Sequence, residues 1–246
     1  VLSLAACGSK SDDAQDNNDD AQQTAGQPIE GGTFVYAIEE PITSLNWYNN
    51  NSTDLGKQVF SNLYDPMWKN NADGSLDYRL AKNVDISEDG TTYTLTLRDD
   101  IYWSDGEKIT TDDIVFTLDT LVEPEVAPST ASGYKVDGEF CSYEKVSDTE
   151  IVFTIGRASN LFKKALGALY VLPAHCFEGV AATEVLTCEQ NDTIATSGAF
   201  VVDSFNVGEK LVCVKNDKYY RTPAHIDGFE VRCVSDAGTQ EIAFQN

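Results

Sequence analysis

Residues 87–98 read Ser87-Glu88-Asp89-Gly90-Thr91-Thr92-Tyr93-Thr94-Leu95-Thr96-Leu97-Arg98. The Glu-Asp-Gly segment is typical of a tight turn. From Thr92 onward, threonine alternates with an apolar side chain. Such alternation is typical of an antiparallel strand that has one face on a core and one face in water. We therefore predict a half-buried strand whose inward residues are Tyr93, Leu95 and Leu97.

A helix is predicted shortly after this strand. The turn Ser104-Asp105-Gly106 is followed by Thr110 and Thr111, either of which can cap a helix that Pro124 ends. Its apolar positions share one face and should be buried: Ile114, Val115, Phe116, Leu118 and Leu121.

The remaining elements are short. Asp54 can cap a second helix that runs through about residue 64 and buries Leu55, Val59, Phe60 and Leu63. Strands are expected at 33–38, 140–146, 150–155, 198–206, 209–215 and 228–234, and short helices at 160–169 and 173–179. Helices mixed with small antiparallel units predict an α+β (mixed α/β) fold.

Composition excludes two classes of protein. The 246 residues include 17 Lys and Arg against 40 Asp and Glu, a net charge of −23. Binding to nucleic acid needs clustered cations, so nucleic acid is not an expected partner. No apolar run approaches the roughly 20 residues that span a bilayer, while 41% hydrophobic residues suffice for a globular core.

The first residues resemble an export signal. The run Leu4-Ala5-Ala6-Cys7 is similar to the bacterial lipobox, whose cysteine receives a lipid. We expect residues 1–6 to be the remnant of a signal peptide and Cys7 to be the lipid attachment site. Residues 7–31 are predicted to form a disordered tether, because the segment from Ser9 to Gln27 has no aromatic or branched aliphatic residue. The alternative is a chance Leu-Ala-Ala-Cys in an ordinary helix.

No residue pattern predicts catalysis, a metal site or a cofactor. His175 and His225 are the only histidines and have no ligand at the spacing of a zinc motif, and no Cys-x-x-Cys, nucleophile elbow or phosphate loop occurs. We therefore expect no enzyme activity. Cys176 and Cys188 flank a loop, and in an exported protein they are either bridged or free.

Several segments resemble the extracellular solute-binding proteins of family 5, which are the oligopeptide, dipeptide and nickel receptors of ABC importers. The first are residues 80–98 and the run 101–116, with Trp103-Ser104-Asp105-Gly106 and Asp113-Ile114-Val115-Phe116. The others follow in family order: Val171-Leu172-Pro173-Ala174-His175, Thr196-Ser197-Gly198-Ala199-Phe200, Lys215-Asn216-Asp217-Lys218-Tyr219-Tyr220 and Ile226-Asp227-Gly228-Phe229-Glu230-Val231. Ala199 departs from the proline that is usual there.

The resemblance implies a periplasmic-binding-protein type II-like fold with two lobes that close on a ligand. By this resemblance we expect the sequence to correspond to the first lobe, with the second lobe missing from it. The first lobe is expected to have a main subdomain, residues 32–60 plus 173–246, and an inserted smaller subdomain, residues 61–172.

The resemblance also implies ligand-binding positions. The loop after Asn46 faces the ligand in peptide-binding relatives, which points to Trp47, Tyr48, Asn49 and Asn50. An aromatic contact after Pro124 corresponds by spacing to Thr130, with Tyr134 four residues on. The alternative for Trp47 and Tyr48 is plain packing of the loop on the lobe.

The implied function is capture of oligopeptides or dipeptides and their delivery to ABC permease subunits. We expect an extracytoplasmic monomer that contacts the cell membrane only through a lipid anchor. Two alternatives remain open. The same fold could bind nickel, a sugar oligomer or another solute, or the protein could be a surface sensor or adhesin lipoprotein.

Overall fold

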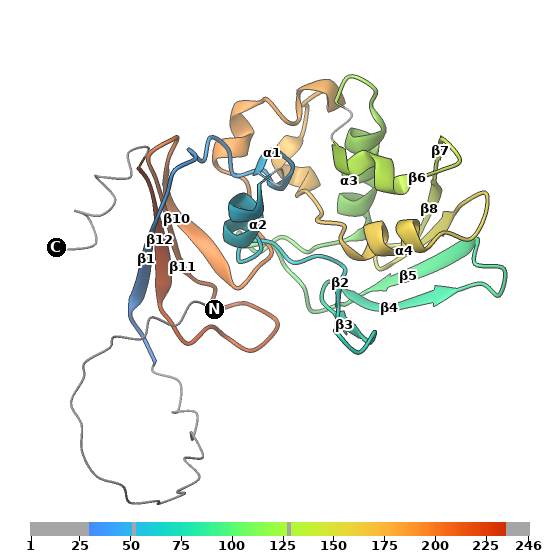
Figure 1. Cartoon of the computed structure of the whole chain (residues 1–246), viewed down its shortest axis with the longest axis horizontal. Helices are drawn as coiled ribbons and strands as arrows, with labels where there is room; N and C mark the ends of the chain where they lie inside the picture. Colours follow the sequence, from blue (N-terminus) through green and yellow to red (C-terminus); the bar gives the residue numbers. More distant parts are fainter. Residues whose placement is uncertain (1–29, 51–52, 127–128, 235–246) are drawn as a thin grey trace, which may run out of the picture.

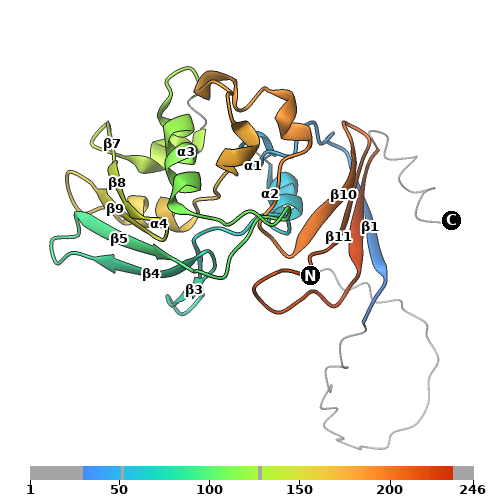
Figure 2. The same cartoon turned by 180° about the vertical axis from the view of Figure 1, so that it is seen from behind.

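The structure is a computed structural model that describes residues 30–50, 53–126 and 129–234 (Figure 1). The predicted signal remnant, the lipid attachment residue Cys7 and most of the predicted tether lie outside the described residues. Two four-stranded sheets stand at opposite ends of the described part, with helices between them (Figures 1 and 2).

The first sheet joins the two ends of the described chain. It contains β1 (Thr33–Ile38), β10 (Phe200–Asn206), β11 (Lys210–Lys215) and β12 (Gly228–Cys233), in the order β1-β12-β11-β10. Strand β1 runs parallel to β12, with Thr33 opposite Gly228, and the other two pairs are antiparallel. Figure 1 accordingly shows the blue β1 directly beside the red-brown β12.

The second sheet is antiparallel throughout. Its order is β4-β5-β9-β8, built from β4 (Ala81–Ile86), β5 (Thr92–Leu97), β8 (Ser142–Ser147) and β9 (Glu150–Thr154). Tyr93, Leu95 and Leu97 are buried, which confirms the predicted face of β5. Helix α4 (Asn160–Gly167) packs on this sheet through Phe162, whose ring meets Tyr93 and Phe153 edge-on.

Helix α3 (Thr111–Val122) begins at the predicted place. Thr110 Oγ1 accepts from the Asp112 backbone N–H, and the Asp113 carboxylate accepts from the Thr110 backbone N–H. Thr110 rather than Thr111 is therefore the cap. Ile114, Leu118 and Leu121 are buried as predicted, whereas the predicted Val115 and Phe116 are half-buried at the edge of the helix face.

Helix α2 (Asp54–Phe60) differs from its prediction at both ends. Thr53, not Asp54, is the N-cap, since its side chain accepts from the Gly56 backbone N–H. The helix ends at Phe60 because the next residues turn tightly, with the backbone N–H groups of Leu63 and Tyr64 both donating to the Phe60 carbonyl. Leu55 is only half-buried. Helix α1 (Trp47–Asn50) precedes α2.

Short elements complete the described part. They are β2 (Trp68–Asn70), β3 (Leu76–Tyr78), β6 (Lys135–Val136), β7 (Glu139–Phe140) and the 3-10 helices η1 (Ser129–Tyr134), η2 (Ala174–Phe177), η3 (Ala182–Glu184) and η4 (Glu189–Asp192). Within residues 30–50, 53–126 and 129–234, none of the helices has the length and apolar character that crossing a membrane requires.

Candidate functional site

The loop predicted to face a ligand follows the carboxyl end of β1, and hydrogen bonds of a buried side chain fix its position. Asn46 is fully buried, and its amide donates to Asn191 Oδ1 at 2.9 Å. Its Oδ1 accepts from the Tyr48 backbone N–H at 2.9 Å, which starts helix α1. The loop is therefore anchored to η4, a segment far away in the sequence.

The two predicted asparagines sit at the surface of this loop. Asn49 Nδ2 donates to Ser44 Oγ and to the Leu186 carbonyl, and Asn50 Nδ2 donates to the carbonyls of Ser44 and Asn46. Both asparagines line a cavity of about 280 Å³ beyond the end of β1, together with Ile38, Glu40, Pro41, Ile42, Thr43, Thr53, Leu55, Gly56 and Val59. These bonds engage the amide nitrogens of both side chains, whereas no side-chain hydrogen bond within residues 30–50, 53–126 and 129–234 reaches their carbonyl oxygens.

The two predicted aromatic residues are packed instead. The Trp47 and Tyr48 side chains are buried, and the Trp47 indole stacks on Tyr170 with ring centroids 3.5 Å apart. The Tyr48 hydroxyl donates to the Tyr170 carbonyl at 2.8 Å. Burial, reinforced by the neighbouring Tyr134 and Tyr170, holds the pKa of Tyr48 well above its ordinary value. In this structure both rings are therefore packed inside the protein, which was the alternative to a ligand-facing position.

Tyr134 belongs to the same packed layer. Its side chain is buried, and its hydroxyl donates to the Ala165 carbonyl at 3.2 Å. Thr130 lies one turn earlier in η1. Tyr170, which contacts both Trp47 and Tyr48, was not among the predicted residues. Its position directly before Val171-Leu172-Pro173 was the only signal, and that signal does not reveal a partner 123 positions away in the sequence.

The structure does not contain the disulfide considered between Cys176 and Cys188, because both are free thiols. Each sulfur has its own local partner. Cys176 Sγ lies 3.5 Å from His175 Nε2, and Cys188 Sγ lies 3.4 Å from the Val185 carbonyl. Cys176 lies within η2, whereas Cys188 directly precedes η4, so proximity in the sequence did not bring their sulfurs together.

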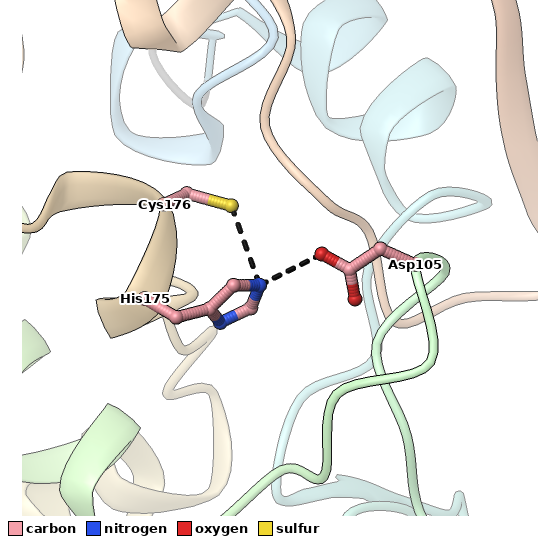
Figure 3. A group of neighbouring side chains, drawn as sticks. All are labelled: Asp105, His175 and Cys176. Carbon is pink, nitrogen blue, oxygen red and sulfur yellow. Dashed lines mark hydrogen bonds and ion pairs between the residues drawn. The ribbon is translucent and has the colours of Figure 1, made fainter.

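Asp105 meets the consecutive residues His175 and Cys176, which lie far from it in the sequence (Figure 3). The His175 Nε2 atom lies 2.7 Å from Asp105 Oδ2 and 3.5 Å from Cys176 Sγ. A nucleophilic Cys-His-Asp triad needs the thiol and the carboxylate on opposite ring nitrogens. Here both approach the same nitrogen, and burial raises the pKa of the Cys176 thiol. The arrangement is not that of a catalytic triad.

Comparisons with known proteins place the chain in a family. The sequence model described as "Bacterial extracellular solute-binding proteins, family 5 Middle" matches residues 76–246. Oligopeptide-binding protein AppA of Bacillus subtilis is 26% identical over 96% of this chain and 42% of that protein. The nickel-binding periplasmic protein of Escherichia coli is 26% identical over 75% of this chain and 34% of that protein. The chain thus spans less than half the length of these relatives.

Solved structures agree with the fold. The ABC transporter substrate-binding protein CtaP from Listeria monocytogenes superposes with a TM-score of 0.78 at 26% identity, covering 88% of this chain and 43% of that one. AppA from Bacillus subtilis, solved in complex with a nonapeptide, gives a TM-score of 0.74 at 23% identity, covering 89% and 43%. The expected mixed α/β fold, matching part of a family 5 binding protein, is confirmed.

Proposed function

The chain belongs to the bacterial extracellular solute-binding proteins of family 5, a family of binding proteins and not of enzymes, and from this premise we propose that it forms the first lobe of a peptide-capturing component of an ABC importer. The peptide assignment is favoured by relatives named for oligopeptide or dipeptide binding. A second lobe and the permease are the further parts that this function requires.

The observation that carries the proposal is the position of the cavity lined by Asn49 and Asn50. It lies beyond the carboxyl end of β1, which runs parallel to β12. Ligands of open α/β sheets bind outside the carboxyl ends of parallel strands. The end of β12 lies at the same edge, where the Val234 backbone N–H donates to the carbonyl of Ile38, a residue that lines the cavity. A second lobe connected there would cover it.

Polar groups in the cavity suit an extended peptide. Glu40, Thr43, Asn49 and Asn50 line it beside apolar Ile38, Leu55 and Val59. A peptide main chain can satisfy its N–H and C=O groups on such side chains, while shallow apolar surface accepts varied side chains. Closure of two lobes would then bury the ligand and present one closed form to a permease.

We also propose that the lobe is divided as the family resemblance implies. The first sheet draws all its strands from residues 32–60 and 173–246, and the second sheet draws all its strands from residues 61–172. Attachment of a lipid at Cys7 would hold the lobe at the outer face of the cell membrane. Radiolabelled palmitate tests the anchor, because a Cys7→Ala variant that still incorporates lipid would refute it.

Peptide binding can be tested with one variant and a matched control. Thr43 is exposed and lines the cavity, so Thr43→Trp should fill it. Thr222 is also exposed but lines a different depression, so Thr222→Trp is the control. The probe is a pool of synthetic nonapeptides, measured on the full-length protein by native mass spectrometry.

We expect wild type and Thr222→Trp to retain peptides and Thr43→Trp to bind them at least about tenfold more weakly, equivalent to about 1.4 kcal/mol. Full retention by Thr43→Trp would refute the assignment of this cavity. Failure of the wild type to bind any peptide would refute the ligand class.

A further inference from the structure

The meeting of Asp105, His175 and Cys176 is built by two segments that are 70 residues apart. Asp105 lies in the turn between β5 and α3, and the other two residues are consecutive in η2. Figure 3 shows the carboxylate arriving from one ribbon and the imidazole and thiol from another. Such convergence cannot be read from ligand spacing in the sequence, which is why no metal site was expected there.

The three donor atoms are close enough together to bind one metal ion. They all lie within 4.8 Å of one another. Asp105 Oδ1 accepts from the Glu107 backbone N–H at 3.1 Å, which fixes the carboxylate and leaves Oδ2 directed at His175. Ligand atoms around a tetrahedral zinc ion are separated by roughly 3.5 Å. The 3.5 Å between Nε2 and Cys176 Sγ equals that value, and the 2.7 Å between Nε2 and Asp105 Oδ2 is shorter, so a side-chain rotation that moves the carboxylate away from the ring would admit an ion.

Solvent can reach the cluster, and the local charge favours a cation. The side chains of Asp105 and His175 are 42% and 31% exposed. Asp105 also lines a cavity of about 470 Å³, to which Asp192 and Asp203 contribute further carboxylates. The described residues that line this cavity include no lysine or arginine. Water from the cavity can complete the coordination of a bound ion.

We propose that Asp105, His175 and Cys176 form a binding site for a divalent transition-metal ion of the zinc class. A thiolate, an imidazole and a carboxylate together are the ligands of zinc and its neighbours rather than of magnesium or calcium. Binding forms metal–sulfur, metal–nitrogen and metal–oxygen bonds, and the thiol proton passes to water. The bound ion would fasten η2 to the turn after β5.

This site is separate from the cavity proposed for peptides. None of its three residues lines the cavity around Asn49 and Asn50. The metal is therefore proposed as a resident ion of the lobe and not as the solute that the protein captures, so loss of metal binding and loss of peptide binding are independent results.

Cobalt(II) is the probe, because a cobalt–thiolate bond gives a charge-transfer absorption in the near ultraviolet. The full chain is titrated with Co²⁺ under anaerobic, reducing conditions. We expect saturation at one equivalent, loss of the absorption when Zn²⁺ is added, and no absorption in Cys176→Ser. Asp105→Asn should weaken binding at least tenfold. Cys188→Ser is the matched control, since Cys188 is also a half-buried free thiol, and it should bind like the wild type.

Several results would overturn the proposal. These are the absence of the band in wild type, a band that survives in Cys176→Ser, and a band that requires Cys188. Unfolding curves recorded without metal show whether each variant folds. If Cys176→Ser does not fold, the exposed Asp105→Asn decides, because unchanged affinity in that variant contradicts the site.

Discussion

The indole of Trp47 lies flat on the phenol ring of Tyr170, with ring centroids 3.5 Å apart and ring planes inclined by 21°. Tyr170 lies two residues before the end of the proposed inserted subdomain, whereas Trp47 belongs to the proposed main subdomain. The Tyr48 hydroxyl donates to the Tyr170 carbonyl beside this stack. The aromatic pair after Asn46 therefore links the two proposed subdomains to each other.

Truncation of the Trp47 side chain should remove its stacking contact with Tyr170 and destabilise the fold. Trp47 is buried, and replacing a buried tryptophan with alanine removes its packing and leaves a cavity, so Trp47→Ala should lower the free energy of unfolding by about 3 kcal/mol. Urea unfolding followed by circular dichroism measures the change. Phe34→Ala is the control, because that side chain is 60% exposed and its removal should cost less than about 1 kcal/mol. Equal losses in both variants would contradict the buried stack.

The buried carboxylate of Asp65 links two segments that are far apart in the sequence. Asp65 Oδ2 accepts from the hydroxyls of Tyr219 and Tyr220 at 2.6 Å and 2.8 Å. Hydrogen bonds to a charged group contribute about 1.5–3 kcal/mol. Tyr220→Phe should therefore lower the free energy of unfolding by about 2 kcal/mol, and the loss should shrink in an Asp65→Asn background. A double-mutant cycle measured by urea unfolding tests this, and additive losses would show that the two residues do not interact.

Acid should weaken the neighbouring ion pairs at Asp77. Burial acts to raise the pKa of this carboxyl, but Arg79 and Arg221 outweigh it and lower the pKa below 3.8. Stability from the ionised form is therefore present above pH 3.8 and is lost as the pH falls through the lower folded value. Melting temperatures of the wild type and Asp77→Asn, measured from about pH 6 to about pH 2, should converge at the acid end. A gap that widens toward low pH would contradict the sign of the shift.

Gly198 marks a close approach between two backbones. A Cβ at this position would lie 2.5 Å from the Asn62 carbonyl oxygen and 2.6 Å from the Leu63 carbonyl carbon. Gly198→Ala should therefore destabilise the lobe by about 2 kcal/mol, since the clash is with backbone that cannot rotate away. Gly156→Ala is the matched control because nothing lies within 4 Å of its Cβ. The midpoint of urea unfolding should move in the first variant only, and an unchanged midpoint in Gly198→Ala would contradict the contact.

Local patterns in the sequence were sufficient for most of the secondary structure. The alternation of Tyr93, Leu95 and Leu97 identified β5 and its buried face, and Thr110 with Pro124 bounded α3. Strand β4 (Ala81–Ile86) was not predicted as a strand, because the adjacent polar residues Lys82 and Asn83 of this edge strand interrupt the apolar/polar alternation. Local sequence patterns thus identify those helices and strands whose own residues determine their position and their buried face.

The candidate sites depend on contacts that no local pattern encodes. Trp47 and Tyr48 were expected to face a ligand because the loop resembles that of peptide-binding relatives, and only the position of Tyr170 shows how their rings pack. Asp105 and His175 looked unrelated because helices α3 and α4 and strands β8 and β9 lie between them in the sequence. Burial of a ring and convergence of donor atoms are consequences of tertiary packing.

Native mass spectrometry of the full-length protein, purified without added ligand from the cells that make it, tests the central claim most directly. A peptide-capturing receptor should retain its cargo, so we predict a series of bound masses that match short peptides and that disappear on unfolding. A protein that carries no peptide, or that carries nickel in place of peptide, would contradict the proposed function.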